Sequence, residues 1–437
     1  HRVHAIHLTV SMKFQFGMTR LASFVVGGLL VVPAEAGRLR RTARSQEELS
    51  TNRTRSNGED SILAQMYPFY HSTQGIHDEL VALASRCPEL SLSTSQGTGS
   101  SGQNRNIDVV TVASKGSTPI NRNFLLFGEH SRELISPESG LHFVKTLCGE
   151  TEGLADIAKE VLKENSFQVV VNGNPDSRRK VESGEFCRRV NPDGVDLNRN
   201  WDEQWQAQAP LDPTDTNPGP APFSEPETRI FKELVTAFQP TMFLTVHSGT
   251  KGMYMPWAFD MQHLADRNQP QMMEILREVD KEHCQCPYGA AGREVGYPCP
   301  GTCLDWVYDN LRTPYSFAFE IYVGEGEEDL KARWQQKMEA DGAAFLQEHS
   351  HLAHEHFQDL FAEYPSSFVQ LKAEHRKKAE IDWTADQCFR NFNPADEQAY
   401  KETVENWSAA YLEMAAKVAA KLKTSALLQT NATSRAA

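Results

Sequence analysis

The stretch Gly128-Glu-His-Ser-Arg-Glu-Leu134 separates two segments of different character. The apolar run at 124–127 before it predicts a buried strand, and the spacing of apolar residues at 135–147 after it predicts a helix. His130 and Glu133 therefore stand where a strand gives way to a helix. Their spacing of three residues puts an imidazole and a carboxylate on the same side of a helical turn, so both side chains can reach one metal ion.

Strands and helices alternate along the chain around this stretch. Strands are expected at 106–112, 123–127, 167–171, 241–246 and 315–321, and helices at 76–84, 135–147, 157–162, 224–238, 263–283 and 398–422. In the fourth helix Ser224 is the expected N-cap and Glu227 completes a capping box. The alternation predicts an α/β fold, with a mixed, mostly parallel central sheet flanked by helices on both faces. Sites in such sheets gather at the carboxyl ends of strands, where His130, His247 and Glu320 fall.

The composition narrows the classes of protein that fit. A chain of 437 residues allows one large domain or two ordinary ones, and an apolar content of 40% is enough for a sizeable core. The net charge of −14, with no large basic patch outside the N-terminal region, argues against nucleic acid as a partner. The eight cysteines, an even number, fit an oxidising compartment.

The N-terminal region has the pattern of a secretory signal peptide. A basic start at Met12 leads into the apolar run 21–32 and then into Pro33-Ala-Glu-Ala36, an end of the Ala-x-Ala type. A membrane anchor is the alternative, but the run is short for a membrane span and no second long apolar run follows. We therefore interpret residues 1–36 as an upstream extension plus signal peptide, and expect a secreted protein without a membrane span. Sequons at Asn52, Asn406 and Asn431 agree with this interpretation.

Three residues could form a hydrolytic zinc site. Such a site needs three protein ligands and one open position for water. His130 and Glu133 supply two ligands, and His247, at the end of the apolar run 241–246, is the natural third. Taken singly, a histidine after a strand or a glutamate beside a helix more often has a structural role. The remaining motifs of the chain decide between the two interpretations.

The decisive segment runs from Cys187 to Trp201, Cys-Arg-Arg-Val-Asn-Pro-Asp-Gly-Val-Asp-Leu-Asn-Arg-Asn-Trp. With it the sequence resembles the zinc metallocarboxypeptidases, the relatives of pancreatic carboxypeptidases A and B. The motifs that carry the resemblance occur in the family's order: His130-Ser-Arg-Glu133, Arg189, Asn198-Arg199-Asn200, Ser224-Glu-Pro-Glu-Thr228, His247-Ser248, Tyr297, Asp305-Trp306 and Tyr315-Ser-Phe-Ala-Phe-Glu320. The resemblance covers about residues 67–323. The segment Cys388–Pro394 and the final helix resemble a plant-type secreted branch.

The resemblance implies a role for each matching residue. His130, Glu133 and His247 would hold one Zn²⁺ per chain, with the two histidines and one glutamate that carboxypeptidases use as zinc ligands. Glu320 would take the proton from the zinc-bound water and pass it to the leaving amine. Arg189 would stabilise the oxyanion, and Asn198 and Arg199 would grip the terminal carboxylate of the substrate. Tyr297 would close over that carboxylate, and Arg132 would add a positive charge to its outer path. Asp196 would accept a hydrogen bond from His130.

The resemblance also bears on specificity and on domain organisation. Leu304, just before Asp305, stands at the family's specificity position, and an apolar residue there implies a neutral or hydrophobic C-terminal side chain in the substrate. Ala258 supplies no acid where the regulatory branch often has one. No pro-domain of the pancreatic size fits between Ala36 and Tyr67. We expect a disordered linker or short pro-segment at 37–62, a catalytic domain at 63–425 with a charged helical insertion at about 325–383, and a disordered tail at 426–437.

The prediction is a secreted, monomeric zinc metallocarboxypeptidase that acts on peptide or protein C-termini. A zinc amidase acting on acyl-amino acids or cell-wall peptides is one alternative, and it could lack the carboxylate grip. A non-catalytic carboxypeptidase-like binding protein is another, and it should lack a ligand or the glutamate. The presence of Asn198, Arg199, Tyr297 and Glu320 favours the first interpretation.

Two further patterns have more than one interpretation. The histidines at 349, 351, 354 and 356 could bind a second metal, but a solvated helix face is the simpler explanation. Cys284-x-Cys286 and Cys299-x-x-x-Cys303 could form a zinc knot, but disulfides are expected in a secreted chain. Disulfides there would stiffen the loop that carries Tyr297.

Overall fold

The computed structural model describes residues 61–99, 102–208, 215–324 and 385–436. The predicted signal peptide at 1–36, nearly all of the predicted linker at 37–62, the charged insertion at about 325–383 and the histidine-rich tract lie outside the described residues. The first described helix is α2, Ile62–Met66, so regular structure begins slightly before Tyr67.

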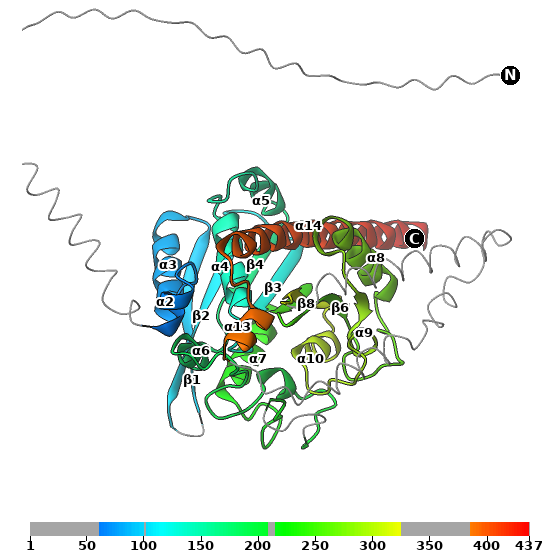
Figure 1. The fold of residues 1–437 in the computed structure, drawn as a ribbon. Coiled ribbons are helices and arrows are strands. Elements are labelled where there is room, and N and C mark those ends of the chain that lie inside the picture. The colour runs from blue at the N-terminus through cyan, green and yellow to red at the C-terminus, as the bar shows by residue number, and fades with distance from the viewer. Residues whose placement is uncertain (1–60, 100–101, 209–214, 325–384, 437) are drawn as a thin grey trace, which may run out of the picture. The chain divides into compact units, whose positions relative to one another are not determined.

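A sheet forms the centre of the described chain (Figure 1). It has eight strands in the order β1-β2-β4-β3-β5-β8-β6-β7. The four adjacent strands β4, β3, β5 and β8 are parallel, and so are β6 and β7. The pairs β1–β2, β2–β4 and β6–β8 are antiparallel. The prediction of a mixed, mostly parallel sheet is confirmed. The strands are β1 Leu90–Thr98, β2 Asn104–Ala113, β3 Asn121–Phe127, β4 Asn165–Val170, β5 Met242–His247, β6 Thr250–Met255, β7 Tyr288–Ala290 and β8 Tyr315–Tyr322.

Helices cover both faces of this sheet because its central strands are apolar on both sides (Figure 1). In β3, Leu125 and Phe127 join the apolar cluster that α4 and α14 cover, whereas Phe124 and Leu126 join the cluster that α7 and α10 cover. The helices are α2, α3 Thr73–Arg86, α4 Ile135–Leu147, α5 Ala155–Val161, α6 Pro175–Glu182, α7 Pro226–Phe238, α8 Gln269–Val279, α9 Ala291–Val295, α10 Cys303–Asn310, α13 Ala385–Phe392 and α14 Glu397–Ala436, with short turns at Leu197–Arg199 and Asp280–Cys284.

Some elements differ from the prediction. The polar strand β1 and the short strands β6 and β7 were not expected, because none of them has the continuous apolar run that marks a central strand. The N-cap of α7 is Glu225, not Ser224, and no side chain caps this helix. The hydroxyl of Ser224 instead contacts the Glu225 carboxylate, and Glu227 pairs with the buried Arg105. Helix α14 continues to Ala436, through most of the segment predicted as a disordered tail.

Three disulfides link segments of the described chain: Cys87–Cys148, Cys187–Cys388 and Cys284–Cys286. The expectation of disulfides was wrong for Cys299 and Cys303, which are buried and belong to none of these three disulfides. No disulfide therefore ties the loop of Tyr297 at that point. Asp280, Cys284 and Cys286 also lie together, but their two sulfurs are bonded to each other and are not available as thiolate ligands for a metal.

Candidate metal centre and active site

Three neighbouring parallel strands place the predicted residues at one edge of the sheet. His247 is the last residue of β5, and it is directly opposite Glu320 in the register with β8. His130 and Glu133 lie in a turn between β3 and α4, rather than in the helix itself. Gly128 starts this turn with a φ of 72°, and a Cβ there would stand 2.8 Å from Pro137, so only glycine fits without strain.

His130, Glu133 and His247 point their donor atoms at one another. Nδ1 of His130 lies 2.8 Å from Oε1 of Glu133 and 3.1 Å from Nδ1 of His247, and Nδ1 of His247 lies 3.1 Å from Oε2 of Glu133. All three side chains are buried. Two imidazole nitrogens and a carboxylate facing each other in a buried space form the donor set of a metal centre.

The opposite ring nitrogen of each histidine has its own oxygen partner. Nε2 of His130 lies 3.0 Å from Oδ1 of Asp196, the residue predicted as its partner. Nε2 of His247 lies 2.9 Å from the hydroxyl of Thr245, and that hydroxyl lies 2.7 Å from the buried carboxylate of Glu129. These contacts fix the orientation of both rings and leave each Nδ1 to face the centre.

Glu129 and Thr245 were missed by the sequence analysis. Glu129 precedes the ligand His130 directly, and Thr245 stands two residues before His247 on the same face of β5. The sequence signal that could have found them is a carboxylate shortly after an apolar run, together with a hydroxyl two positions before a metal ligand. Neither residue type is distinctive until the strands lie side by side.

Burial and neighbouring charges shift the pKa values of the acidic and basic groups in this centre. Burial by itself would raise the pKa of Glu133, but His130 and His247 hold it well below its usual range. Burial lowers the pKa of His247, but hydrogen bonds with Glu129 and Glu133 raise it to about 10. Burial and the nearby Glu133 raise the pKa of Glu320 to about 7. One carboxylate of the centre is thus held ionised, while another can take up a proton near neutral pH.

Arg189 lies close to the metal donors and shares the carboxylate of Asp196 with His130. Its Nε and Nη2 donate to Oδ2 of Asp196 at 3.1 and 3.0 Å, and its Nη1 lies 3.5 Å from Oε1 of Glu133. Burial lowers the pKa of Arg189, but Asp196 and Glu133 raise it, so the guanidinium keeps its charge. A fixed positive charge therefore lies against the metal ligands.

Asn198 contacts one of the metal donors, and Arg199 and Tyr297 act on each other electrostatically. Oδ1 of Asn198 accepts a hydrogen bond from the backbone N–H of Cys303 at 3.0 Å, so its amide NH₂ points the other way, toward His247 Nε2 at 3.3 Å. The buried Arg199 donates from Nη1 to its neighbour's carbonyl, and its Nε has no partner among the described residues. Cys299 and burial raise the pKa of Tyr297 to about 12, and the charges of Arg199, Arg189 and Glu320 act on it as well.

Leu304 lies in a small apolar cluster of its own. Tyr254, Ala258, Ala291 and Cys299 are buried with it, and Tyr297 packs against the cluster. Asp305 holds the neighbouring backbone in place by accepting hydrogen bonds from Ala258 and Phe259 at 2.9 Å. The predicted specificity residue and the predicted closing tyrosine therefore share one apolar surface.

Arg132 lies beside the centre but is already engaged. Nη1 donates to Asp215 at 2.9 Å and to the carbonyl of Cys187 at 3.1 Å, and the guanidinium carbon stands 4.2 Å from the centre of the Phe392 ring. Its charge is thus balanced by Asp215. The structure gives no support to the expected role of Arg132 on the path of the substrate carboxylate.

Comparison with known proteins agrees with this geometry. The sequence model of a family described as zinc carboxypeptidase matches residues 76–340, which is more than half of the chain. The chain belongs to the zinc carboxypeptidase family. The chain is 26% identical to mouse carboxypeptidase A2 over 302 residues, covering 64% of this chain and 67% of that protein. It is 27% identical to rat carboxypeptidase B over 277 residues, covering 58% of this chain and 64% of that protein.

Solved structures show the same fold. Bovine thrombin-activatable fibrinolysis inhibitor, in complex with a tick carboxypeptidase inhibitor, matches with a TM-score of 0.54 and 18% identity, covering 80% of this chain and 98% of that one. This likeness confirms the predicted carboxypeptidase-like α/β architecture. Among the curated relatives, the chain spans about two thirds of the length of the two named above.

Zinc, the metal of the family, fits the donor set. In a tetrahedral zinc site with bonds of about 2.0 Å, neighbouring donor atoms stand about 3.3 Å apart. The three donors lie 2.8–3.1 Å apart, so they need to separate only slightly to hold the ion. Oε2 of Glu320 and Oγ of Ser248 are further buried polar atoms without a hydrogen-bond partner among the described residues.

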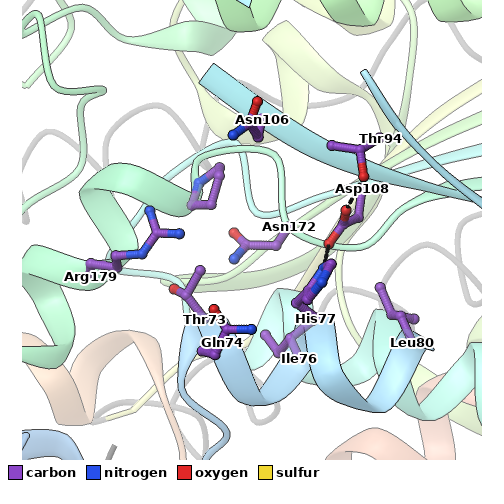
Figure 2. Close-up of a pocket in the computed structure, with 11 residues that line it drawn as sticks. Thr73, Gln74, Ile76, His77, Leu80, Thr94, Asn106, Asp108, Asn172 and Arg179 are labelled. Atoms are coloured by element: carbon purple, nitrogen blue, oxygen red, sulfur yellow. Dashed lines mark hydrogen bonds and ion pairs between the residues drawn. The ribbon is translucent and has the colours of Figure 1, made fainter. Parts of the chain in front are cut away.

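A separate cavity lies between α3, α6 and strands β1 and β2, and has a volume of about 240 Å³ (Figure 2). His77 pairs there with Asp108, and the side chain of Asn172 points into the space. None of the three metal donors lines it.

In the part of the chain that the structure describes, no helix has the length and apolar character to span a membrane.

Proposed function

We propose that the protein is a zinc-dependent exopeptidase that removes one residue at a time from the C-terminus of peptides or proteins. The observation that carries this proposal is the meeting of three metal donors, His130, Glu133 and His247, with the carboxylate of Glu320 at the ends of neighbouring strands. The amide and guanidinium expected to hold a terminal carboxylate come from Asn198 and Arg199 of one short turn.

Glu320 is assigned the proton transfers. Zinc bound by the three donors would lower the pKa of a water molecule and polarise the scissile carbonyl. The Glu320 carboxylate, whose pKa is raised by burial and by Glu133, would accept a proton from that water and later deliver it to the leaving amine. Oε2 of Glu320 has no partner among the described residues, so it is free to make this contact.

Arg189 is assigned to the developing oxyanion. Its guanidinium is anchored to Asp196 through two hydrogen bonds and lies 3.5 Å from a ligand carboxylate. A positive charge fixed in this way needs no rearrangement when negative charge develops on the carbonyl oxygen. Asp196 therefore orients two groups, Arg189 and His130, with one carboxylate.

Asn198, Arg199 and Tyr297 are assigned to the terminal carboxylate of the substrate. The Asn198 amide is oriented by the backbone of Cys303, which leaves its N–H groups as donors. The planar guanidinium of Arg199 matches a carboxylate with two parallel hydrogen bonds. The charge of Arg199 acts on Tyr297, and we assign Tyr297 to close over an anion held by Arg199. This grip on a free carboxylate is what separates an exopeptidase from an amidase.

The apolar cluster around Leu304 supports a preference for neutral or hydrophobic C-terminal residues. The buried members of this cluster, among them Tyr254, Ala258 and Leu304, carry no charge that would attract a lysine or arginine. Burying one leucine-sized side chain contributes roughly 1.5–3 kcal/mol. We assign this energy to recognition of the terminal side chain.

Secretion remains part of the proposal. The disulfides Cys87–Cys148 and Cys187–Cys388 join segments far apart in the sequence, as is usual for proteins of an oxidising compartment. The sequon at Asn406, in α14, gives no support, because the oxygen and the nitrogen of its side-chain amide are both hydrogen-bonded to His283. The proposal of secretion therefore rests on the N-terminal pattern and on the disulfides.

A peptide panel tests the proposed function. Peptides that differ only in the C-terminal residue are incubated with the zinc-loaded full chain, with a chelator, and with Glu320→Gln. We expect chelator-sensitive release of single residues, fastest for Leu or Phe, and slower by roughly 10²–10⁴-fold in the mutant. One bound zinc per chain without release from any peptide would contradict the proposal. Cleavage of acyl-amino acids in its place would favour an amidase.

A further inference from the structure

A segment from near the C-terminus lies against the loops that carry the metal donors. The side chain of Asn393 is buried, accepts a hydrogen bond from the backbone N–H of Ile135 at 2.9 Å, and donates to the carbonyl of Arg132 at 2.8 Å. The disulfide Cys187–Cys388 ties the preceding helix α13 to the segment that leads into Arg189. The end of α13 is therefore anchored on two sides.

This anchoring fixes the position of Phe392, the last residue of α13. The guanidinium of Arg132 covers one face of its ring at 4.2 Å from the ring centre. The ring edge lies against Gly249, where an added Cβ would stand 2.2 Å from Cε1 of Phe392. Gly249 also has a φ of 115°, so both the backbone and the space there require glycine.

The two residues that Phe392 contacts each lie two positions from a metal donor. Arg132 follows His130, and Gly249 follows His247. The aromatic ring is therefore held at the rim of the metal centre, and its side chain keeps intermediate exposure to solvent. Phe392 does not belong to the apolar cluster around Leu304, to which we assign the terminal side chain of the substrate.

We propose that Phe392 recognises the side chain of the residue that precedes the terminal residue of the substrate, and favours apolar or aromatic side chains there. In a bound peptide, the terminal carboxylate would lie at Arg199 and the scissile carbonyl beside the three metal donors. The residues before the scissile bond must then leave the centre past its rim, on a side other than that of Arg199. Phe392 offers a rigid apolar surface at this rim, and Arg132 holds the ring in place by a cation–π contact. The inference rests on the proposed exopeptidase function.

Hydrolysis of peptides with a constant C-terminal leucine and a variable penultimate residue tests this inference. The ratio of kcat/KM for penultimate Phe over penultimate Gly is measured for the zinc-loaded full chain, for Phe392→Ala and for Phe392→Leu. We expect a ratio of about 10 in the wild type, a fall of at least fivefold in Phe392→Ala and a smaller fall in Phe392→Leu. The preference at the terminal position should not change in either variant.

Binding provides a second readout that does not depend on turnover. In the Glu320→Gln background, Kd values for the same two peptides should show the same ratio and the same loss with Phe392→Ala. Thermal unfolding of each variant shows whether the fold is kept. Equal ratios with and without the Phe392 ring, in folded protein, would overturn the assignment of Phe392 alone. No release from any peptide by the wild type would overturn the proposed function together with this inference.

Discussion

Asp196 and His130 are joined by a contact of 3.0 Å between Oδ1 of the carboxylate and Nε2 of the imidazole, while Oδ2 of the same carboxylate holds Arg189. Burial alone would raise the pKa of Asp196, but Arg189 and His130 hold it well below its usual range. The ionised carboxylate therefore orients a metal donor and the proposed oxyanion group together. Both histidine donors thus depend on a group behind them, Asp196 for His130 and Thr245 for His247.

Asp196→Asn should weaken zinc binding. An amide at this position cannot balance the positive charge of Arg189, and it orients the His130 ring less firmly. Loss of such a partner typically costs 10–100-fold in metal affinity. Competition with a chromophoric chelator measures the affinity, with Asp202→Asn, an exposed aspartate a few residues along the chain, as the matched control. An unchanged zinc affinity in Asp196→Asn would show that this carboxylate does not orient the ligand.

Thr245→Val should weaken zinc binding through the other histidine. The mutation removes the hydroxyl between Nε2 of His247 and the carboxylate of Glu129, and leaves buried polar atoms without their partner. We expect about a tenfold loss of zinc affinity and a loss of roughly 1–3 kcal/mol in the free energy of unfolding. Thr245→Ser keeps the hydroxyl and is the matched control. Equal losses in both variants would show that the effect does not come from the hydroxyl specifically.

Arg199→Lys should raise KM more than it lowers kcat. Lysine keeps the positive charge but loses the planar pair of donors that matches a carboxylate. For a peptide with a free C-terminus we expect KM to rise by about tenfold, and by more in Arg199→Gln, which also loses the charge. Steady-state kinetics on one peptide give both constants. A large fall in kcat at constant KM would instead place Arg199 in the chemical step.

Asp305 should make the stability of the folded protein depend on pH. Burial raises the pKa of this carboxyl from 3.8 to about 7. The folded protein therefore holds a proton that the unfolded chain has already lost, so the stabilisation is full below about pH 4 and is lost as the pH rises through about 7. Between pH 5 and pH 8 the loss in free energy of unfolding should be about 3 kcal/mol.

The variant Asp305→Asn isolates this contribution. Its free energy of unfolding should fall less than that of the wild type between pH 5 and pH 8, because the amide does not titrate. Urea unfolding of both proteins at the same zinc concentration measures the difference, and pH effects on the metal ligands are common to both. Parallel pH profiles for the two proteins would mean that Asp305 is already ionised in the folded state.

The sequence predicted the centre of the sheet better than its edges. Apolar runs in β3, β5 and β8 mark strands buried on both faces. The sequence therefore placed His130, His247 and Glu320 at or near the carboxyl ends of these strands. Strand β1 was missed because only Leu90 in it is buried, so its sequence lacks an apolar pattern. Ser224 has the composition of an N-cap, but its hydroxyl is taken by Glu225 and Asn200.

Contacts between distant segments could not be predicted in the same way. The Thr245–Glu129 contact and the position of Phe392 depend on side chains that meet only after the strands and α13 have packed. Cysteine spacing suggested disulfides but could not identify the partners, and Cys299 and Cys303 do not form one. The family resemblance predicted the metal donors and Asp196 behind His130, whereas Thr245 and Glu129 behind His247 needed the structure.

The measurement that tests the central claim most directly compares one peptide with a free C-terminal carboxylate and the same peptide with a C-terminal amide. Both are given to the zinc-loaded full chain, and released residues are followed by mass spectrometry. We predict release of the terminal residue from the free peptide and a rate at least roughly 10²-fold lower for the amide, because Asn198, Arg199 and Tyr297 would lose their charged partner. Equal cleavage of both peptides, or cleavage at internal bonds, would contradict the account.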